Sequence, residues 1–442
     1  MFDGTESRST LVSFFGRANY SLNDTYLLSG SLRTDGSSRF GPDSRWGVFP
    51  AVSGAWVMTK DLFKGSNWLD ELKLRGSWGL TGNQPSDLYP YQGTAGTSNY
   101  GGTPGLANSS LSNPALKWES TEQVDLGVDL TLFKGRVFLT ADWYKKNTQD
   151  LLLARPISNT SGFTTVFDNV GDMTNKGFEI GLETVNIQAK DSKGFNWRTG
   201  LNLSINRNEV TKLANNEPFS SYVNRVQVGH ELGEFYMLKF LGVDPATGDA
   251  IFKDVDGDGV ITSNDQTFVG SPHPDYSGGL TNEFTWKGVD LSFLMTFSQG
   301  NKIYNDMRTY SASGGYYFDN QFKDQLKRWQ KPGDQTDVPR ASYDGVSGAY
   351  GDPTSRFLEN GSYLRMQEIT MGYQFPENWA AGVKARSLRL YAGVRNAFVI
   401  TDYSGYDPDV NSGGSSTNVS LANDFYAYPQ ERTVILGIQA GW

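Results

Sequence analysis

Residues 124–132 read VDLGVDLTL, and the alternation of side chains in this stretch decides the fold. Its apolar side chains share one parity: Val124, Leu126, Val128, Leu130 and Leu132. The polar or small ones share the other: Asp125, Gly127, Asp129 and Thr131. Successive side chains of a β-strand point to opposite faces, so this segment has one apolar face and one polar face.

The same period of two recurs along the chain. It predicts thirteen strands, at about residues 10–20, 26–34, 46–58, 71–82, 121–133, 136–152, 173–186, 195–208, 275–286, 289–304, 363–375, 387–400 and 430–442. Their connections alternate in length, and the long ones cover about residues 83–120, 153–172, 209–274, 305–362 and 401–429. This pattern predicts an all-β fold, a transmembrane antiparallel β-barrel with short periplasmic turns and long extracellular loops. The last strand ends on an aromatic residue, Trp442, which is typical of such barrels.

Composition agrees with a membrane wall made of strands. Hydrophobic residues make up 38% of the chain and mean hydropathy is −0.46, values that look soluble. No run approaches the 18 or so apolar residues of a membrane helix, whereas a barrel strand needs only its outward half to be apolar. The net charge of −9 (39 basic against 48 acidic residues) argues against a nucleic-acid partner. Cysteine is absent, and the polar N-terminus has no signal-peptide pattern, so we expect a longer precursor.

Several local motifs resemble the C-terminal β-barrel portion of SusC/RagA-type TonB-dependent outer-membrane transporters. They are LRTDGSSRFG at 32–41, LKLRGSWGLTGNQ at 72–84, LKWE at 116–119, DWYKKNTQDLL at 142–152, NKGFE at 175–179, DVDGDG at 254–259 and YSGYDP at 403–408. Their order and spacing cover nearly the whole chain. The resemblance therefore extends over residues 1–442.

The resemblance implies a 22-stranded barrel in the bacterial outer membrane, of which this chain would supply about 13 strands. Such a barrel is closed by an N-terminal plug and capped by a SusD-like surface lipoprotein. An oligosaccharide or peptide ligand enters when TonB pulls on the plug. The plug, the TonB-contacting region and the early strands have no counterpart in this sequence, so we expect that the chain alone does not transport.

Residues 254–265, within the 209–274 connection, read DVDGDGVITSND and fit the template of a calcium-binding loop. Carboxylates occupy positions 1, 3 and 5 (Asp254, Asp256 and Asp258), and Val260 offers its backbone carbonyl at position 7. Position 12 is Asp265 instead of the usual Glu, and helix signals do not flank the loop. We expect a structural Ca²⁺ site, and the alternative is an acidic turn held by its own backbone bonds. A hairpin over about 235–243 and 250–253 is expected beside it.

Seven aromatic residues in the long loops are candidates for contact with ligand or lid: Tyr89, Tyr91, Tyr100, Tyr316, Tyr317, Phe318 and Tyr426. Packing of loop on loop is the alternative. Charges of the lumen-facing parity could line a substrate path, although such charges more often pair with one another: Arg75, Asp125, Asp129, Glu179, Glu183, Arg389 and Arg395. No catalytic motif is present, and neither His230 nor His273 has a partner at metal-ligand spacing. An enzyme is not expected.

The sequence therefore favours the barrel part of a nutrient importer. A calcium-stabilised extracellular β-protein that binds glycans and never enters a membrane is the alternative from another class. A fragment that is inactive on its own is a third interpretation, because terminal strands with unpaired edges favour aggregation.

Overall fold

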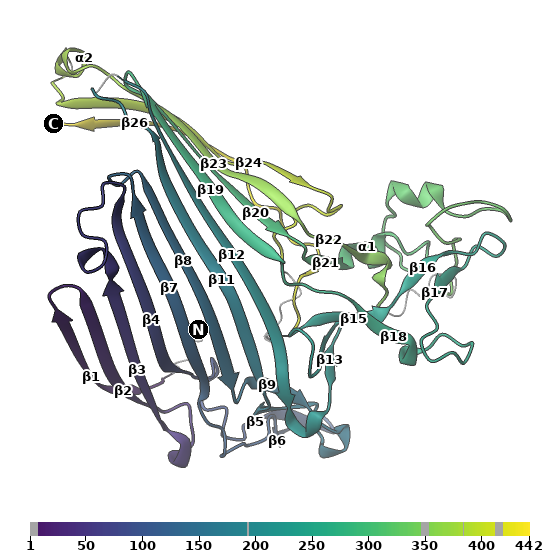
Figure 1. Ribbon diagram of the computed structural model, residues 1–442. Coiled ribbons are helices and arrows are strands. Elements are labelled where there is room, and N and C mark those ends of the chain that lie inside the picture. The colour runs from purple at the N-terminus through teal and green to yellow at the C-terminus, as the bar shows by residue number, and fades with distance from the viewer. Residues whose placement is uncertain (1–7, 192–193, 346–352, 383, 412–418) are drawn as a thin grey trace. The chain divides into compact units, whose positions relative to one another are not determined.

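Thirteen antiparallel strands form one sheet in the computed structural model, which describes residues 8–191, 194–345, 353–382, 384–411 and 419–442 (Figure 1). In sheet order they are β1 (Leu11–Leu22), β2 (Tyr26–Ser37), β3 (Trp46–Val57), β4 (Leu69–Asn83), β7 (Glu119–Leu132), β8 (Val137–Gln149), β11 (Gly171–Ile187), β12 (Asn196–Leu213), β19 (Tyr276–Trp286), β20 (Val289–Gln299), β23 (Tyr363–Gln374), β24 (Ser387–Thr401) and β26 (Thr433–Gly441). Spatial order equals chain order. All thirteen predicted strands are confirmed.

The chain divides into two compact units. The first comprises Met1–Glu183, Asn206–Phe219 and Gln227–His230. The second comprises Thr184–Ile205, Ser220–Val226 and Glu231–Trp442. Each unit is described on its own below.

Connections at one end of the strands are short, and backbone conformation explains how they turn. Residues 287–288 join β19 to β20 with φ of 49° at Lys287 and 87° at Gly288. Positive φ at both central residues gives the turn whose twist matches that of the flanking strands. Asn23 and Asp24 follow the same rule, with φ of 52° and 50°, between β1 and β2. Most connections at the opposite end are long, as the alternating lengths predicted, but the one between β2 and β3 covers only residues 38–45 and is shorter than those at 58–68 and 375–386.

Three predicted strands extended too far, and one of them, predicted over 430–442, begins only at Thr433. The strand predicted over 136–152 ends at Gln149, because Asp150 takes a left-handed conformation with φ of 58°. The strand predicted over 289–304 ends at Gln299, because Gly300 has φ of 93°. In both places a short strand with different partners follows the break, so a continuous pattern of side chains conceals a change of direction.

Pairing register places apolar side chains on one face of the sheet. In the first unit, Leu28 pairs with Gly54 and Leu126 with Gly76, and the two leucines are 57% and 55% exposed. In the second unit, Leu436 pairs with Ala392 on the same parity and is 78% exposed. An exposed apolar face of this extent needs an apolar environment, which a bilayer supplies.

Smaller elements occupy the long connections. They pair as β5 (Ala95–Tyr100) with β6 (Thr103–Asn108), β9 (Leu152–Pro156) with β10 (Thr165–Asn169), and β16 (Phe240–Val243) with β17 (Ala250–Phe252). The last pair confirms the hairpin expected there. Two further sheets contain β13 (Phe219–Ser221), β14 (Asn224–Val226), β15 (Glu234–Leu238) and β18 (Gln266–Gly270), and β21 (Lys302–Asn305), β22 (Leu358–Asn360) and β25 (Asn423–Asp424).

Helix is confined to short segments such as α1 (Asp306–Ser311) and α2 (Glu377–Gly382). Within the described residues, no helix has both the length and the apolar character needed to cross a membrane.

Buried apolar cores lie among the long connections. One cluster in the first unit contains Phe40, Leu116 and Leu152. A second, in the second unit, contains Val223, Phe235, Met237, Tyr304, Ala312 and Phe357. These clusters give the loops a fixed structure of their own.

A buried polar network also joins three long connections of the second unit. The Tyr222 hydroxyl donates to Asp306 Oδ1 at 2.8 Å, and the Tyr403 hydroxyl donates to Asp424 Oδ2 at 2.6 Å. Both carboxylates are buried, at 6% and 2% exposure, and β25 with Asp424 runs parallel to β21, which ends beside Asp306. Burial raises the pKa of the Asp306 carboxyl, and the Asp424 charge acts in the same direction.

This raised pKa predicts that the loop network loses stability as pH rises. A folded state that holds the Asp306 proton more tightly than the unfolded state is most stable below the ordinary carboxyl pKa. Its stability falls as pH rises from there through the raised pKa. Asp306→Asn should remove this dependence and slow amide hydrogen exchange in β21 and α1 at pH 7.5, after correction for intrinsic rates. The exposed Asp319, changed to Asn, is the control. An unchanged pH dependence in Asp306→Asn would contradict the assignment.

Candidate functional site

The polar face of the first unit carries a compact charge network. Arg75 approaches Asp129 at 2.7 Å and Asp142 at 2.9 Å, and Lys73 Nζ lies 3.1 Å from Asp129 Oδ2. The register brings them together, because Asp129 pairs with Lys73 on β4 and with Thr140 on β8. These charges pair with one another, as the sequence analysis favoured. Their role is therefore to stabilise the wall, and they are not free to line a substrate path.

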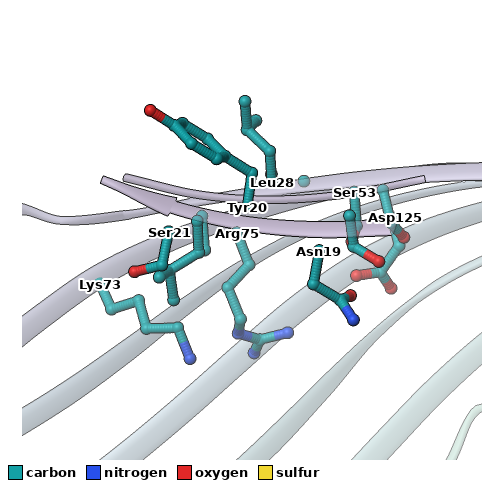
Figure 2. A pocket seen from close by; sticks show the side chains of 14 residues that line it. Asn19, Tyr20, Ser21, Leu28, Ser53, Lys73, Arg75 and Asp125 are labelled. Carbon is teal, nitrogen blue, oxygen red and sulfur yellow. The ribbon is translucent and has the colours of Figure 1, made fainter. Parts of the chain in front are cut away.

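A concave pocket of about 430 Å³ lies beside this network and is lined by β1 to β4 and by Asp125 of β7. Figure 2 shows Lys73, Arg75 and Asn19 on one side of the strands, and Tyr20 and Leu28 on the other. The picture separates the two faces directly. The pocket offers cationic, carboxylate, hydroxyl and amide groups beside apolar surface, a combination suited to solutes or to another protein segment of mixed polarity.

Charges of the second unit pair in the same way. Arg389 Nε donates to Asp290 Oδ1 at 3.0 Å, and Arg395 Nε lies 3.3 Å from Glu368 Oε2. In each pair both residues belong to the sheet, on strands β20, β23 and β24. The predicted lumen charges Arg389 and Arg395 thus have structural partners.

One ion pair joins the wall to a long connection. Arg365 of β23 bonds to Asp407, and both side chains are 4% exposed. Asp407 also accepts the backbone N–H groups of Asp409 at 2.9 Å and Gln430 at 3.1 Å. A buried charge that lost this partner would be strongly destabilising, so the pair fixes where the 402–432 connection folds. Asp407 belongs to the YSGYDP motif, so the buried ion pair with Arg365 explains why the motif contains an aspartate.

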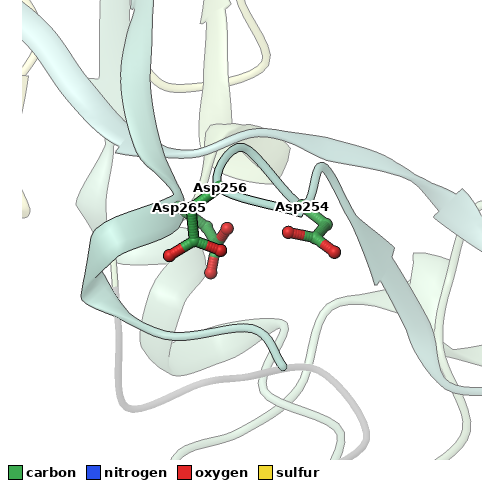
Figure 3. Close-up of side chains that lie close together, drawn as sticks. All are labelled: Asp254, Asp256 and Asp265. Atoms are coloured by element: carbon green, nitrogen blue, oxygen red, sulfur yellow. The ribbon is translucent and has the colours of Figure 1, made fainter. Parts of the chain in front are cut away.

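The Asp-rich loop brings together three of its predicted ligands. Carboxylate oxygens of Asp254, Asp256 and Asp265 lie within 4.8 Å of one another (Figure 3). Asp258 is not in this group, and its Oδ1 accepts the Val260 N–H at 2.7 Å instead. Val260 is otherwise an exposed loop residue.

Backbone hydrogen bonds shape this loop. Asp254 accepts the N–H groups of Gly257 at 2.7 Å and Gly259 at 3.0 Å. The N–H groups of Thr262 and Val255 hold the pKa of Asp265 below its usual range, so this buried carboxylate is ionised. Oxygen donors in an anionic loop are what a hard divalent cation prefers.

The candidate loop aromatics separate into packed and exposed side chains. Tyr91 and Tyr316 pack against the two apolar clusters, and the Tyr317 ring lies 4.7 Å from that of Tyr310. The Tyr89 hydroxyl donates to the Arg8 carbonyl at 2.8 Å. By contrast, Phe318 is 94% exposed and Tyr426 is 45% exposed. Tyr100 ends β5, and its side chain lies outside the described residues.

Sequence reasoning missed an aromatic residue of the same kind. Tyr428 is 95% exposed in the 402–432 connection, two positions beyond Tyr426. The signal that selected the other candidates, an aromatic residue in a polar loop, was present there too. Exposure separates Phe318 and Tyr428 from the packed tyrosines.

Comparison with known proteins identifies the family. Residues 2–397 match the family described as "TonB dependent receptor-like, beta-barrel". TonB-dependent receptor P26 of Formosa agariphila is 33% identical over 458 residues, 97% of this chain and 46% of that protein. TonB-dependent receptor SusC of Bacteroides thetaiotaomicron is 33% identical over 463 residues, 98% of this chain and 44% of that protein.

A solved structure, "Structure of the RagAB peptide transporter", aligns with a TM-score of 0.86 at 29% identity. The alignment covers 98% of this chain and 48% of that one, so the chain spans about half the length of its relatives. The predicted resemblance and fold class are confirmed. TonB-dependent receptors are transport proteins of the outer membrane, which also confirms that the chain is not an enzyme and excludes a protein that never enters a membrane. The chain belongs to the TonB-dependent receptor-like β-barrel family and forms part of a SusC-like outer-membrane barrel.

Proposed function

We propose that this chain forms part of the barrel wall, the polar lumen and the outer loops of a SusC-like importer for oligosaccharides or peptides. The observation that carries the proposal is the sorting of side chains by strand parity. One parity is apolar and exposed, whereas the other holds paired charges beside a pocket lined by both polar and apolar groups. Such a wall separates lipid from a water-filled path.

The partners of the proposed importer are a SusD-like surface lipoprotein and TonB. The RagAB relative is a peptide transporter, which supports a peptide ligand. Oligosaccharides are the alternative that the resemblance of the sequence motifs implies. Phe318 and Tyr428 support lid docking, because large exposed aromatic side chains are frequent anchors of protein interfaces. Contact with TonB is assigned to the portion of the relatives that this chain does not span.

Purification of the full-length transporter from native outer membranes tests the proposal. We expect a surface lipoprotein to copurify, and mass spectrometry of released small molecules to find peptides or oligosaccharides. Phe318→Ala and Tyr428→Ala should each weaken lipoprotein binding about thirtyfold, since an interface anchor contributes about 2 kcal/mol, and the double variant should lose the copurifying lipoprotein.

Trp379→Ala is the matched control, because Trp379 is 63% exposed but belongs to the short connection 375–386. It should leave copurification unchanged. A wild-type transporter that purifies with neither lipoprotein nor ligand would contradict the proposed function.

We also propose that residues 254–265 bind a structural Ca²⁺ ion. Asp254, Asp256 and Asp265 would supply carboxylate oxygens, Asp258 a further one after a small rotation, and Val260 its carbonyl. The clustering of three carboxylates and the ionised state of Asp265 support this. Without the usual Glu at position 12, the affinity should be that of extracellular modules, with a Kd of about 0.1–1 mM.

Amide hydrogen exchange of the 250–268 segment should slow when Ca²⁺ is added at about 5 mM, with no such effect of Mg²⁺. Asp256→Ala should abolish the effect. Asp244→Ala is the control, because Asp244 accepts the Ala246 N–H at 2.8 Å in a similar turn outside the cluster. Equal exchange with and without Ca²⁺ in the wild type would reject the site.

A further inference from the structure

A group of polar side chains interrupts the apolar face of the second unit. Trp197 pairs with Phe284, Thr199 with Asn282 and Leu201 with Leu280, so all six share one face of β12 and β19. The opposite parity carries Arg198 and Glu283, the polar face. Thr199 and Asn282 therefore lie among side chains directed at lipid, where an unsatisfied polar group costs several kcal/mol.

Hydrogen bonds link these groups into a directed chain. The Thr184 hydroxyl donates to Asn186 Oδ1 at 3.0 Å, and Asn186 Nδ2 donates to Thr199 Oγ1 at 2.7 Å. The Thr199 hydroxyl then donates to Asn282 Oδ1 at 2.7 Å. The indole N–H of Trp197 donates to the same oxygen at 2.8 Å. We call Thr184, Asn186, Trp197, Thr199 and Asn282 the outer-face cluster.

The chain of bonds fixes the orientation of the Asn282 amide. An indole N–H only donates, so the atom that it contacts must be the amide oxygen. The Asn282 NH₂ group therefore points away from Trp197 and Thr199. No described residue accepts a hydrogen bond from it, although Asn282 is only 7% exposed. On a face directed at lipid, a donor without a protein partner calls for an acceptor from outside the protein.

Aromatic side chains frame the same spot. The Trp197 ring stacks on Phe284 at 5.8 Å, Phe195 stacks on Phe284 at 6.2 Å, and Phe293 of β20 lies 6.1 Å from Phe284. Trp286, at the end of β19, is 54% exposed beside the short turn. These rings resemble the interfacial aromatic girdle of membrane barrels.

The position along the strand sets the depth in the membrane. Asn282 lies four positions before Trp286, the last residue of β19. Four residues span about 13 Å along a strand, or about 10 Å along the membrane normal at the usual tilt. With Trp286 at the outer limit of the interfacial layer, which is about 5–7 Å thick, Asn282 lies about 3–5 Å below the boundary of the hydrocarbon core, near the layer that holds the ester carbonyls.

We propose that the outer-face cluster is a binding site for one glycerophospholipid of the periplasmic leaflet. The amide N–H of Asn282 donates to an ester carbonyl oxygen of the lipid, and Trp197, Phe284 and Phe293 contact its acyl chain. Ester carbonyls are the acceptors found at this depth, and a lipid chain fits the aromatic frame. The proposal requires only the outer-membrane location of the barrel, and a transporter with any ligand would satisfy it.

Native mass spectrometry of the full-length transporter with diester phosphatidylethanolamine tests the site. The wild type should retain one lipid at collision energies that remove the others. Asn282→Leu, close in size but without donors, should retain it about tenfold less, as expected for loss of a hydrogen bond worth about 1.4 kcal/mol. Asn202→Leu is the matched control, because Asn202 lies on the opposite face beside Gly279. Heat-modifiable gel mobility confirms that each variant is folded.

A second measurement needs no variant. Diether phosphatidylethanolamine keeps the phosphate but lacks the ester carbonyls, so the wild type should lose its retained lipid with this probe. Equal retention of diester lipid by the wild type and Asn282→Leu would overturn the proposal. Equal retention of diether and diester lipids by the wild type would overturn it as well, since the acceptor would then be the phosphate or a protein neighbour.

Discussion

Backbone hydrogen bonding is the constraint on which the rest of this structure depends. Hydrocarbon offers no partner for a peptide N–H or C=O, so strands that cross a bilayer must bond to neighbouring strands. Eleven of the thirteen strands, paired in unbroken chain order, meet this requirement along both edges, whereas β1 and β26 are each paired along one edge. Strand pairing then imposes a period of two on the side chains, and the membrane decides which parity is apolar. Long irregular segments lie at the ends of the strands, and irregularities inside the sheet are local bulges such as the one between Met366 and Glu368.

Polar groups inside this wall are held by partners. Asp129 joins Lys73 and Arg75 across strands, and Arg365 holds Asp407 of a long connection. The same rule holds on the outer face, where Thr199 and Trp197 satisfy the oxygen of Asn282. The Asn282 nitrogen has no protein acceptor among the described residues, and a lipid acceptor would complete it. Function and stability thus depend on the same pairing rule, applied on both faces.

The period of two predicted every strand of the sheet, because alternation is a local property of the sequence. It failed at Asp150 and Gly300, where a single left-handed residue redirects a chain that still alternates. Contacts between distant loops, such as Tyr222 with Asp306, carry no local signal at all. The Asp-rich loop could be recognised in the sequence because its candidate ligands all lie within twelve consecutive positions. Asn282 is a polar residue at an apolar position of its strand, and the sequence alone shows this. Its hydrogen-bond partners on the neighbouring strand became known only from the register.

Spin labelling at residues 200–204 tests the two-faced wall most directly, since the chain has no native cysteine to remove. Single-cysteine variants of the full-length transporter in lipid bilayers would be compared for relaxation by oxygen and by a water-soluble nickel complex. Labels at Leu201 and Leu203 should respond mainly to oxygen, and labels at Gly200, Asn202 and Ser204 should respond relatively more to nickel. Uniform accessibility along the segment, or a period other than two, would contradict the barrel wall.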